Sequence, residues 1–460
     1  MLSLRIVTLL ACLLASTIAL AGCSGSSGSN MLGGQGRGGG PGPSPPPSRF
    51  IKHVVVMVQE NRSFDNFFAT FPGADGARSG VMQTSHGDIR VHLEEASFSS
   101  DELGHDHVSF QRELDGGKMD GFGLVARKLP GGTRVPAGTY AYRVVAPQYI
   151  APYWTIAHQY VLGDHMFMTQ GSSSFTAHQD LIAGGTPIGR NGDNVIDFPT
   201  PPFWGCDAPP GTVTSLITSN GSYLFDRGPF PCFTYPTLRD LLDARRVSWR
   251  YFTNTSSSSV WNAFDAVAAV RQGPEWSTNV VRPPTAIFNA IAGRKLPAVS
   301  WVIPNAGESD HPGFDYGHGP AWIASVVNAI GESPYWSSTV VIVVWDDWGG
   351  EYDHAAPPQL DGQGLGMRVP MLLVSAYARE AVAGRPGYIS HTQYEFGSIV
   401  KFIEDIWSLG QLGTTDYRAN SLIDCFDFSQ APRPFTRIPS TYSKSYFERE
   451  PPSRLPVDTY

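Results

Sequence analysis

Four apolar runs, each rich in β-branched residues, stand out along the chain and predict buried strands. They cover residues 53–58, 298–303, 339–344 and 369–374. Polar residues do not alternate with apolar ones inside these runs, so both faces of each strand are expected to be covered by protein. This pattern is typical of a parallel sheet.

Segments with helical periodicity alternate with the strands. They cover residues 237–242, 322–330 and 396–407, and the first of them precedes a fifth predicted strand at 247–252. Such alternation predicts an α/β fold with a mainly parallel central sheet sandwiched by helices. We interpret 50–425 as one domain, with a loop-rich insertion or cap at 185–235 and an irregular C-terminal tail at 426–460.

The N-terminal segment reads as a targeting signal rather than as part of the fold. Arg5 precedes an apolar run that ends at Leu20, and Ala21-Gly22-Cys23 follows. The pattern predicts a lipoprotein signal peptide at 1–22 with Cys23 as the lipid-modified residue, or, alternatively, a plain signal peptide with a chance cysteine. The run is shorter than the roughly 20 residues of a membrane span. Residues 23–49, rich in Gly, Pro and Ser, then form a tether, and the protein is expected at the bacterial cell envelope, on the periplasmic or surface side.

Composition narrows the class of protein. A content of 42% hydrophobic and 16% charged residues argues against disorder, and a net charge of -8 gives no reason to expect a nucleic-acid partner. Because an exported protein meets an oxidising compartment, a disulfide between Cys206 and Cys232 is predicted, both lying in the same insertion. The chain has no Cys-x-x-Cys pair, which argues against a thiolate zinc site.

Polar side chains follow two of the predicted strands. Glu60 and Asn61 come after the first strand, and Asp346 and Asp347 come after the strand at 339–344. Ligands of parallel sheets bind beyond the carboxyl ends of the strands, and carboxylates crowded there repel one another unless a cation intervenes. Oxygen ligands suit a hard or borderline divalent metal. Taken singly, Asn61 reads as a helix cap and the Asp pair as surface ion pairs; taken together, the four predict a site for one divalent metal ion of unspecified identity.

A candidate nucleophile lies in the segment 168–184, where small residues permit a tight turn into a helix. Ser174 is the first choice, with Ser172, Ser173 and Thr176 as alternatives, because a helix N-terminus favours phosphate and stabilises an alkoxide. The alternative interpretation is a Ser-rich loop with ordinary capping. Histidines are further candidates: His311, His354 and His391 lie near the strand ends, and His105 and His107 lie in the segment GHDHVSF. We interpret His158, His165, His178 and His318 as structural.

Four motifs give the chain a family resemblance. They are VVMVQENRSFDNFF, GGKMDGF, WDDWGGEYDHAAPP, and RVPMLLVSAYA followed by GYISHTQYEFGSIVKFIEDIW. With them, residues 50–410 resemble the bacterial phosphoesterase family, which includes phospholipases C of the non-haemolytic type and a secreted acid phosphatase, within the alkaline-phosphatase-like superfamily.

The resemblance implies a role for individual residues. Glu60, Asn61, Asp346 and Asp347 match metal ligands, and Ser174 matches the nucleophile that also touches the metal. His105, His311, Asp353 and His354 match further site residues, with His311 or His354 expected to protonate the leaving group. The sequence departs from the family pattern at Ser172-Ser173, which replace a Gly-Pro pair, at Asp310, where Glu is common, and at Asp347, where many relatives carry Glu.

The sequence thus predicts metal-dependent hydrolysis of phosphoesters through a phosphoserine intermediate, of the phospholipase C type on phospholipids. Acid phosphatase activity on soluble phosphomonoesters is the alternative within the same class. A non-catalytic surface binding lipoprotein is the alternative from a different class, and it would predict loss of the acidic ligands or of the nucleophile. A sulfatase is disfavoured because no Cys/Ser-x-Pro-x-Arg motif occurs.

Overall fold

The computed structural model describes residues 46–450, except for short gaps at 189–193, 200–203, 255–258, 315–316, 362–363 and 383–386. The predicted signal peptide, Cys23 and nearly all of the tether lie outside the described residues. The described part belongs to one compact unit that begins at Pro45.

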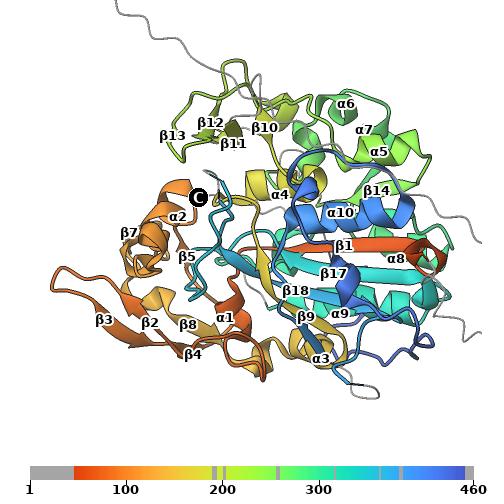
Figure 1. Cartoon of the computed structure of the whole chain (residues 1–460), viewed down its shortest axis with the longest axis horizontal. Coiled ribbons are helices and arrows are strands. Elements are labelled where there is room, and N and C mark those ends of the chain that lie inside the picture. Colours follow the sequence, from red (N-terminus) through yellow and green to blue (C-terminus); the bar gives the residue numbers. More distant parts are fainter. Residues whose placement is uncertain are drawn as a thin grey trace, which may run out of the picture. The chain divides into compact units, whose positions relative to one another are not determined.

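A nine-stranded sheet forms the centre of this unit (Figure 1). Its strand order is β15-β14-β16-β1-β17-β18-β9-β19, and β20 also pairs with β9. The bounds are β1 His53–Gln59, β9 Val161–Phe167, β14 Trp249–Phe252, β15 Val280–Val281, β16 Val299–Val302, β17 Thr339–Trp345, β18 Arg368–Ser375, β19 Tyr388–Ser390 and β20 Tyr394–Glu395. Every residue of β17 and β18 is buried, as in strands covered on both faces.

The prediction of a mainly parallel α/β sheet is confirmed, with one strand reversed. All neighbouring strands run parallel except β18, which pairs antiparallel with both β17 and β9. The start of β18, at Arg368, therefore lies at the same sheet edge as the carboxyl ends of β1, β17 and β9. The apolar run at 369–374 could not reveal its direction, because burial on both faces gives the same pattern in either orientation.

Helices cover the sheet (Figure 1). Helix α4 packs against α10. Helix α3 packs against α9, and α9 also contacts α8 and α11. The helices longer than one turn are α1 Phe64–Phe68, α2 His107–Leu114, α3 Ala151–Gln159, α4 Ser174–Ala183, α5 Leu238–Ala244, α8 Ala286–Ala292, α9 Gly319–Gly331 and α10 Phe396–Trp407; α11 spans Lys444–Phe447. The predicted helices at 237–242, 322–330 and 396–407 correspond to α5, α9 and α10.

Two predicted segments contain more structure than the sequence indicated. The segment 185–235 is more than a loop, because it holds a four-stranded antiparallel sheet of β10 Pro187–Ile188, β11 Asn194–Pro199, β12 Thr214–Thr218 and β13 Tyr223–Leu224. The predicted disulfide between Cys206 and Cys232 is present in it. The tail after residue 425 is irregular but not separate, since Ile438 and Phe447 are buried in the main core. Within the part of the chain that the structure describes, no helix has the length and apolar character needed to cross a membrane.

Candidate active site

The first corner of the site is built by two adjacent parallel strands. Gln59 at the end of β1 pairs with Trp345 at the end of β17, so Glu60 and Asp346 leave the sheet side by side. The backbone N–H of Asn61 donates a hydrogen bond of 3.1 Å to Oδ1 of Asp346. The strand register therefore brings together the two polar pairs that the sequence placed 285 positions apart.

A tight turn after β17 fits against this corner. Asn61 has a left-handed backbone with φ of 58°, and Gly349 has φ of 63°. The N–H of Gly349 donates a hydrogen bond of 2.8 Å to Oδ1 of Asp347. A Cβ at Gly349 would lie 2.4 Å from the carbonyl oxygen of Asn61, so glycine is required for steric as well as conformational reasons.

Ser174 opens helix α4 directly beside the acidic corner. Its Oγ donates a hydrogen bond of 3.0 Å to Oδ2 of Asp347. The alternative hydroxyls lie elsewhere: Ser172 bonds Asp197 of the insertion, and Thr176 donates to Ser172 at 2.6 Å. Among the nucleophile candidates, Ser174 is thus the one whose hydroxyl contacts the acidic corner. We call Glu60, Asn61, Ser174, Asp346 and Asp347 the acidic site.

His178 is a site residue that the sequence analysis wrongly left as structural. Its Nε2 lies 3.1 Å from Oε1 of Glu60 and 3.5 Å from Oδ2 of Asp346. It follows Ser174 by four residues on α4, so both side chains lie on one face of the helix. The helical spacing from Ser174 was the signal that could have identified it.

One of the predicted histidines, His105, contacts the acidic site, and a second, His311, lies beside it. Nδ1 of His105 donates to the carbonyl oxygen of Leu103 at 2.7 Å, which leaves Nε2 to accept the amide N–H of Asn61 at 3.1 Å. The ring of His311 lies 6.3 Å from that of His105 between centroids. Both imidazoles are buried, so each lies in surroundings that exclude water.

The electrostatics of the acidic site are compatible with a bound cation. All five of its residues have no exposed surface. Burial, and then the charge of Glu60, raise the pKa of Asp346 well above its usual range. The amide oxygen of Asn61 is buried and accepts no hydrogen bond from the residues that the structure describes. A set of carboxylate, amide and hydroxyl oxygens of this kind is compatible with a divalent metal ion.

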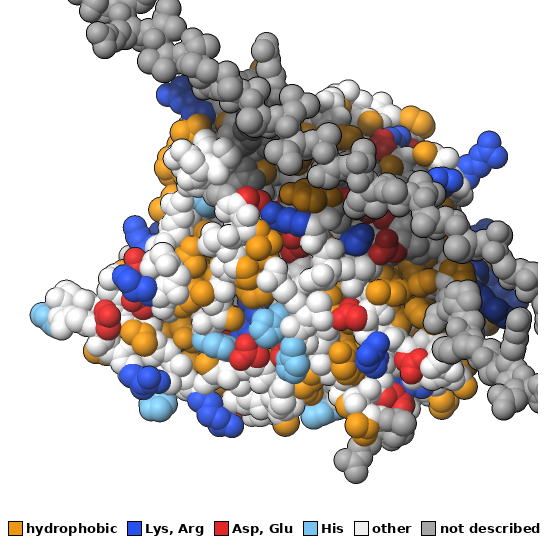
Figure 2. Space-filling view, viewed as in Figure 1, with side chains coloured by type: hydrophobic (Ala, Val, Ile, Leu, Met, Phe, Trp, Pro, Cys, Tyr) orange, Lys and Arg blue, Asp and Glu red, His pale blue; other side chains and the backbone are white. Residues whose placement is uncertain are grey.

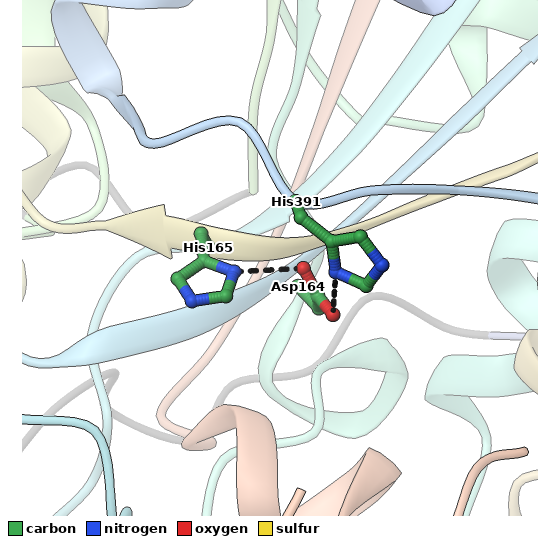
Figure 3. A group of neighbouring side chains, drawn as sticks. All are labelled: Asp164, His165 and His391. Atoms are coloured by element: carbon green, nitrogen blue, oxygen red, sulfur yellow. Dashed lines mark hydrogen bonds and ion pairs between the residues drawn. The ribbon is translucent and has the colours of Figure 1, made fainter. Parts of the chain in front are cut away.

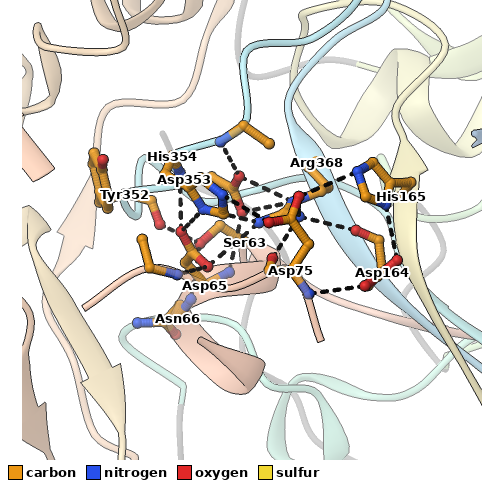
Figure 4. A network of polar contacts seen from close by, with 12 residues as sticks. Ser63, Asp65, Asn66, Asp75, Asp164, His165, Tyr352, Asp353, His354 and Arg368 are labelled. Carbon is orange, nitrogen blue, oxygen red and sulfur yellow. Dashed lines mark hydrogen bonds and ion pairs between the residues drawn. The ribbon is translucent and has the colours of Figure 1, made fainter. Parts of the chain in front are cut away.

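Asp353 and His354 belong to a different network (Figure 4). Nδ1 of His354 lies 2.7 Å from Oδ2 of Asp65, and Arg368 contacts Asp353 at 3.0 Å and Asp65 at 3.3 Å. Their contacts run toward α1 and the start of β18 rather than toward Ser174. Arg368 was missed because its position at the site edge depends on the reversed direction of β18.

Comparison of the sequence with known proteins identifies a family and several relatives. The model of the Phosphoesterase family matches residues 51–410, and the chain belongs to that family. It is 24% identical to the non-hemolytic phospholipase C of Pseudomonas aeruginosa over 85% of this chain and 59% of that protein. It is 25% identical to phospholipase C A of Mycobacterium tuberculosis over 72% of this chain and 68% of that protein.

The chain therefore spans less than two thirds of the length of its Pseudomonas relative. A solved structure described as a protein in the alkaline phosphatase superfamily from Vibrio parahaemolyticus aligns over 82% of this chain and 72% of that one, with 10% identity and a TM-score of 0.36. Similarity this low carries no argument about function.

Proposed function

We propose that the protein hydrolyses phosphoester bonds at the acidic site, with Ser174 as the nucleophile. The observation that carries the proposal is the hydrogen bond from the Ser174 hydroxyl to Asp347, at the N-terminus of α4 and inside a buried set of oxygen ligands. The partial positive charge of a helix N-terminus stabilises both the alkoxide and an approaching phosphate. Membership of the Phosphoesterase family supports the same reaction class.

The reaction follows from these positions in two steps. The Ser174 hydroxyl loses its proton to a neighbouring carboxylate, and its oxygen forms a bond to phosphorus while the bond to the leaving alkoxide breaks. A protonated histidine gives its proton to that alkoxide. Water then attacks the phosphoserine and gives one proton to the histidine, while the carboxylic acid returns its proton to the Ser174 oxygen and the phosphate product leaves. We assign the proton donor to His311, because both ring nitrogens of His105 are engaged, by Leu103 and Asn61, and the contacts of His354 run to Asp65 and Asp75.

One divalent metal ion completes the proposed site. Glu60, Asn61, Asp346 and Asp347 would hold it, together with the Ser174 oxygen. When bound, the ion lowers the pKa of the hydroxyl and balances charge on the phosphoryl oxygens. The four residues that would hold the ion directly follow β1 and β17, and His178 on α4 contacts Glu60 at 3.1 Å and would orient it.

We propose a phospholipid head group as the substrate, cleaved in the manner of a phospholipase C. The names of the relatives support this choice, since the Pseudomonas and Mycobacterium proteins are both phospholipases C. A cavity of about 410 Å³ lies next to the nucleophile segment, lined by Thr169 and Gln170, by insertion residues Thr186 and Pro187, and by Arg418.

A paired assay tests the proposal. We expect the purified protein to hydrolyse p-nitrophenylphosphorylcholine faster than p-nitrophenyl phosphate, and to lose both activities with a chelator. Faster hydrolysis of p-nitrophenyl phosphate would identify an acid phosphatase acting on soluble phosphomonoesters. Inactivity toward both substrates, with no metal bound by elemental analysis, would instead identify a binding lipoprotein.

We also propose that Cys23 carries a lipid anchor that holds the enzyme at the cell envelope. The proposal rests on the signal pattern before Cys23 and on the tether at 23–49 that would connect it to the folded unit. We expect Cys23→Ala to move the protein from the membrane fraction to the soluble fraction without changing its activity on a soluble substrate. Membrane association that survives the substitution would contradict the anchor.

A further inference from the structure

A second cluster of metal-ligating side chains lies on strand β9 and beyond strand β19, outside the acidic site. Asp164 and His165 are neighbours in β9, and His391 directly follows β19, which pairs parallel with β9. Oδ1 of Asp164 lies 2.8 Å from Nδ1 of His165, and its Oδ2 lies 2.8 Å from Nδ1 of His391 (Figure 3). One ligand atom from each of the three residues lies within 4.8 Å of the others.

The second nitrogen of His165 is held by another carboxylate. Its Nε2 lies 3.2 Å from Oδ2 of Asp75, while the backbone N–H of Asp75 donates to Asp164 at 2.9 Å. A neutral imidazole has one N–H, so it can satisfy one carboxylate as a donor and faces the other with a lone pair. With Nε2–H donating to Asp75, Nδ1 of His165 is left as a lone pair beside Asp164. Carboxylates hold the outer nitrogen of metal-bound histidines in this way.

The nearby basic side chains are already paired with carboxylates, and the histidines of the cluster are partly exposed. Two basic groups lie beside the cluster. Arg368 is engaged by Asp353, by Asp65 and, at 3.6 Å, by Asp75, while its Nη1 donates to the backbone carbonyl oxygen of Asp164 at 3.0 Å. Nε2 of His354 lies 3.3 Å from Oδ1 of Asp75. The carboxylate of Asp164 itself is buried and is shared by the two imidazoles. His391 has 59% of its side chain exposed and His165 has 27%. An ion could therefore enter from solvent and retain water as a further ligand.

We propose that Asp164, His165 and His391 form a second metal site, separate from the acidic site, for a borderline divalent cation such as Zn²⁺. Two imidazole nitrogens and one carboxylate oxygen are a ligand set that suits zinc and disfavours Mg²⁺ or Ca²⁺, which take oxygen ligands. In Figure 2, histidine and acidic side chains gather at one place on the viewed face of the molecule. This site does not depend on the function proposed for Ser174.

The position of the site indicates a structural role. Its ligands join strand β9 to the segment after β19, and Asp75 adds the segment that follows α1. A bound ion would thus tie together three parts of the chain at the edge of the sheet where β9 ends. Because such an ion binds the folded protein and not the unfolded one, it would raise the melting temperature in proportion to the logarithm of its concentration.

Zinc binding by the purified full-length protein tests the proposal. After metal removal, we expect Zn²⁺ titration followed by elemental analysis to give one equivalent fewer in His391→Ala than in the wild type. Loss of this ligand should weaken that equivalent by more than about 100-fold, and Asp75→Asn should weaken it by about 10–100-fold. His92→Ala, which removes an exposed histidine of β3 (Ile89–His92), is the matched control and should bind as the wild type does.

The Asp346→Asn background separates this site from the acidic one. It should retain one zinc equivalent, which is lost when His391→Ala is added, whether or not Asp346 binds metal itself. Co²⁺ should report the same difference through its visible ligand-field absorption, and circular dichroism checks that each variant is folded. If folded His391→Ala binds Zn²⁺ with the stoichiometry and affinity of the control, the cluster is a hydrogen-bonded Asp–His pair and the proposal fails.

Discussion

The hydroxyl of Ser174 donates a 3.0 Å hydrogen bond to Asp347, although the two residues are 173 positions apart in the chain. This contact joins the N-terminus of α4 to the end of β17, and β1 adds Glu60 and Asn61 from its own end. Three segments with no local relationship thus build one water-excluded cluster. Carboxylates buried together repel one another unless a proton or a cation intervenes, which points to a site for binding or chemistry.

Ser174→Ala should reduce phosphodiester hydrolysis by at least about a thousandfold, because the nucleophile forms the covalent bond to phosphorus. The melting temperature should stay close to that of the wild type, since the side chain is small. Ser173→Ala, in the residue that precedes the helix, is the matched control and should retain most of the activity. Comparable losses in both variants would move the nucleophile away from position 174.

Asp346→Asn should abolish metal-dependent activity without destabilising the metal-free protein. Burial and Glu60 raise the pKa of Asp346, so its ionised form costs stability at neutral pH, and an amide removes that cost while its oxygen still accepts the N–H of Asn61. In the His391→Ala background, which lacks the second proposed site, a hundredfold excess of metal over Kd should raise the unfolding free energy by about 2.7 kcal/mol when Asp346 is present, but not when Asp346→Asn is added. Differential scanning calorimetry with and without chelator measures this, with exposed Asp88→Asn as control. An unchanged response to metal after Asp346→Asn is added to this background would contradict the assignment of this ligand.

Gly349→Ala should destroy the acidic site through a steric conflict. Its new Cβ would meet the carbonyl oxygen of Asn61 at 2.4 Å, in addition to the strain of φ at 63°. Gly116 has the same φ and nothing within 4 Å of its hypothetical Cβ, so Gly116→Ala isolates the cost of backbone strain, about 1 kcal/mol. Activity should be lost in Gly349→Ala and kept in Gly116→Ala, and equal activity in the two variants would refute the steric argument.

The His354–Asp65 pair should make stability depend on pH in the alkaline range. Burial lowers the pKa of His354, but the hydrogen bond and charge of Asp65 outweigh it and raise the pKa to about 9 from an ordinary value of 6.5. The folded state therefore holds a proton that the unfolded state releases. The resulting stabilisation is complete below about pH 6.5 and disappears as the pH rises through about 9.

Urea unfolding of the wild type and of His354→Asn, in chelator, checks this dependence. Between pH 6.5 and pH 10, the free energy of unfolding should fall by up to about 3 kcal/mol more in the wild type than in the variant, since each pKa unit corresponds to 1.36 kcal/mol. His92→Asn, in an exposed strand position, should follow the wild type. Parallel pH profiles for wild type and His354→Asn would show that the ion pair contributes nothing measurable.

Some parts of this structure followed from local pattern. The runs at 53–58 and 339–344 are so apolar that they had to be buried strands, and the polar residues that follow them had to lie at a sheet edge. Strand β9 was not predicted because Gly163, Asp164 and His165 interrupt its apolar pattern. Asp164 and His165 make contacts in the second cluster. His178 was not predicted as a site residue, because its helical spacing from Ser174 indicates a shared helix face but not which residues pack against that face.

The sequence by itself determined five of the nine sheet strands and the acidic residues at the ends of two of them, because burial and secondary structure leave a periodic record in neighbouring residues. The cysteine pair followed from the position of both residues in one insertion. The tertiary structure alone decided which strand is reversed, which serine meets Asp347, and that Asp353 and His354 join Asp65 and Arg368 instead. These outcomes depend on distances between segments far apart in the chain. Local periodicity carries no information about such distances, since they are set by the packing of the whole core.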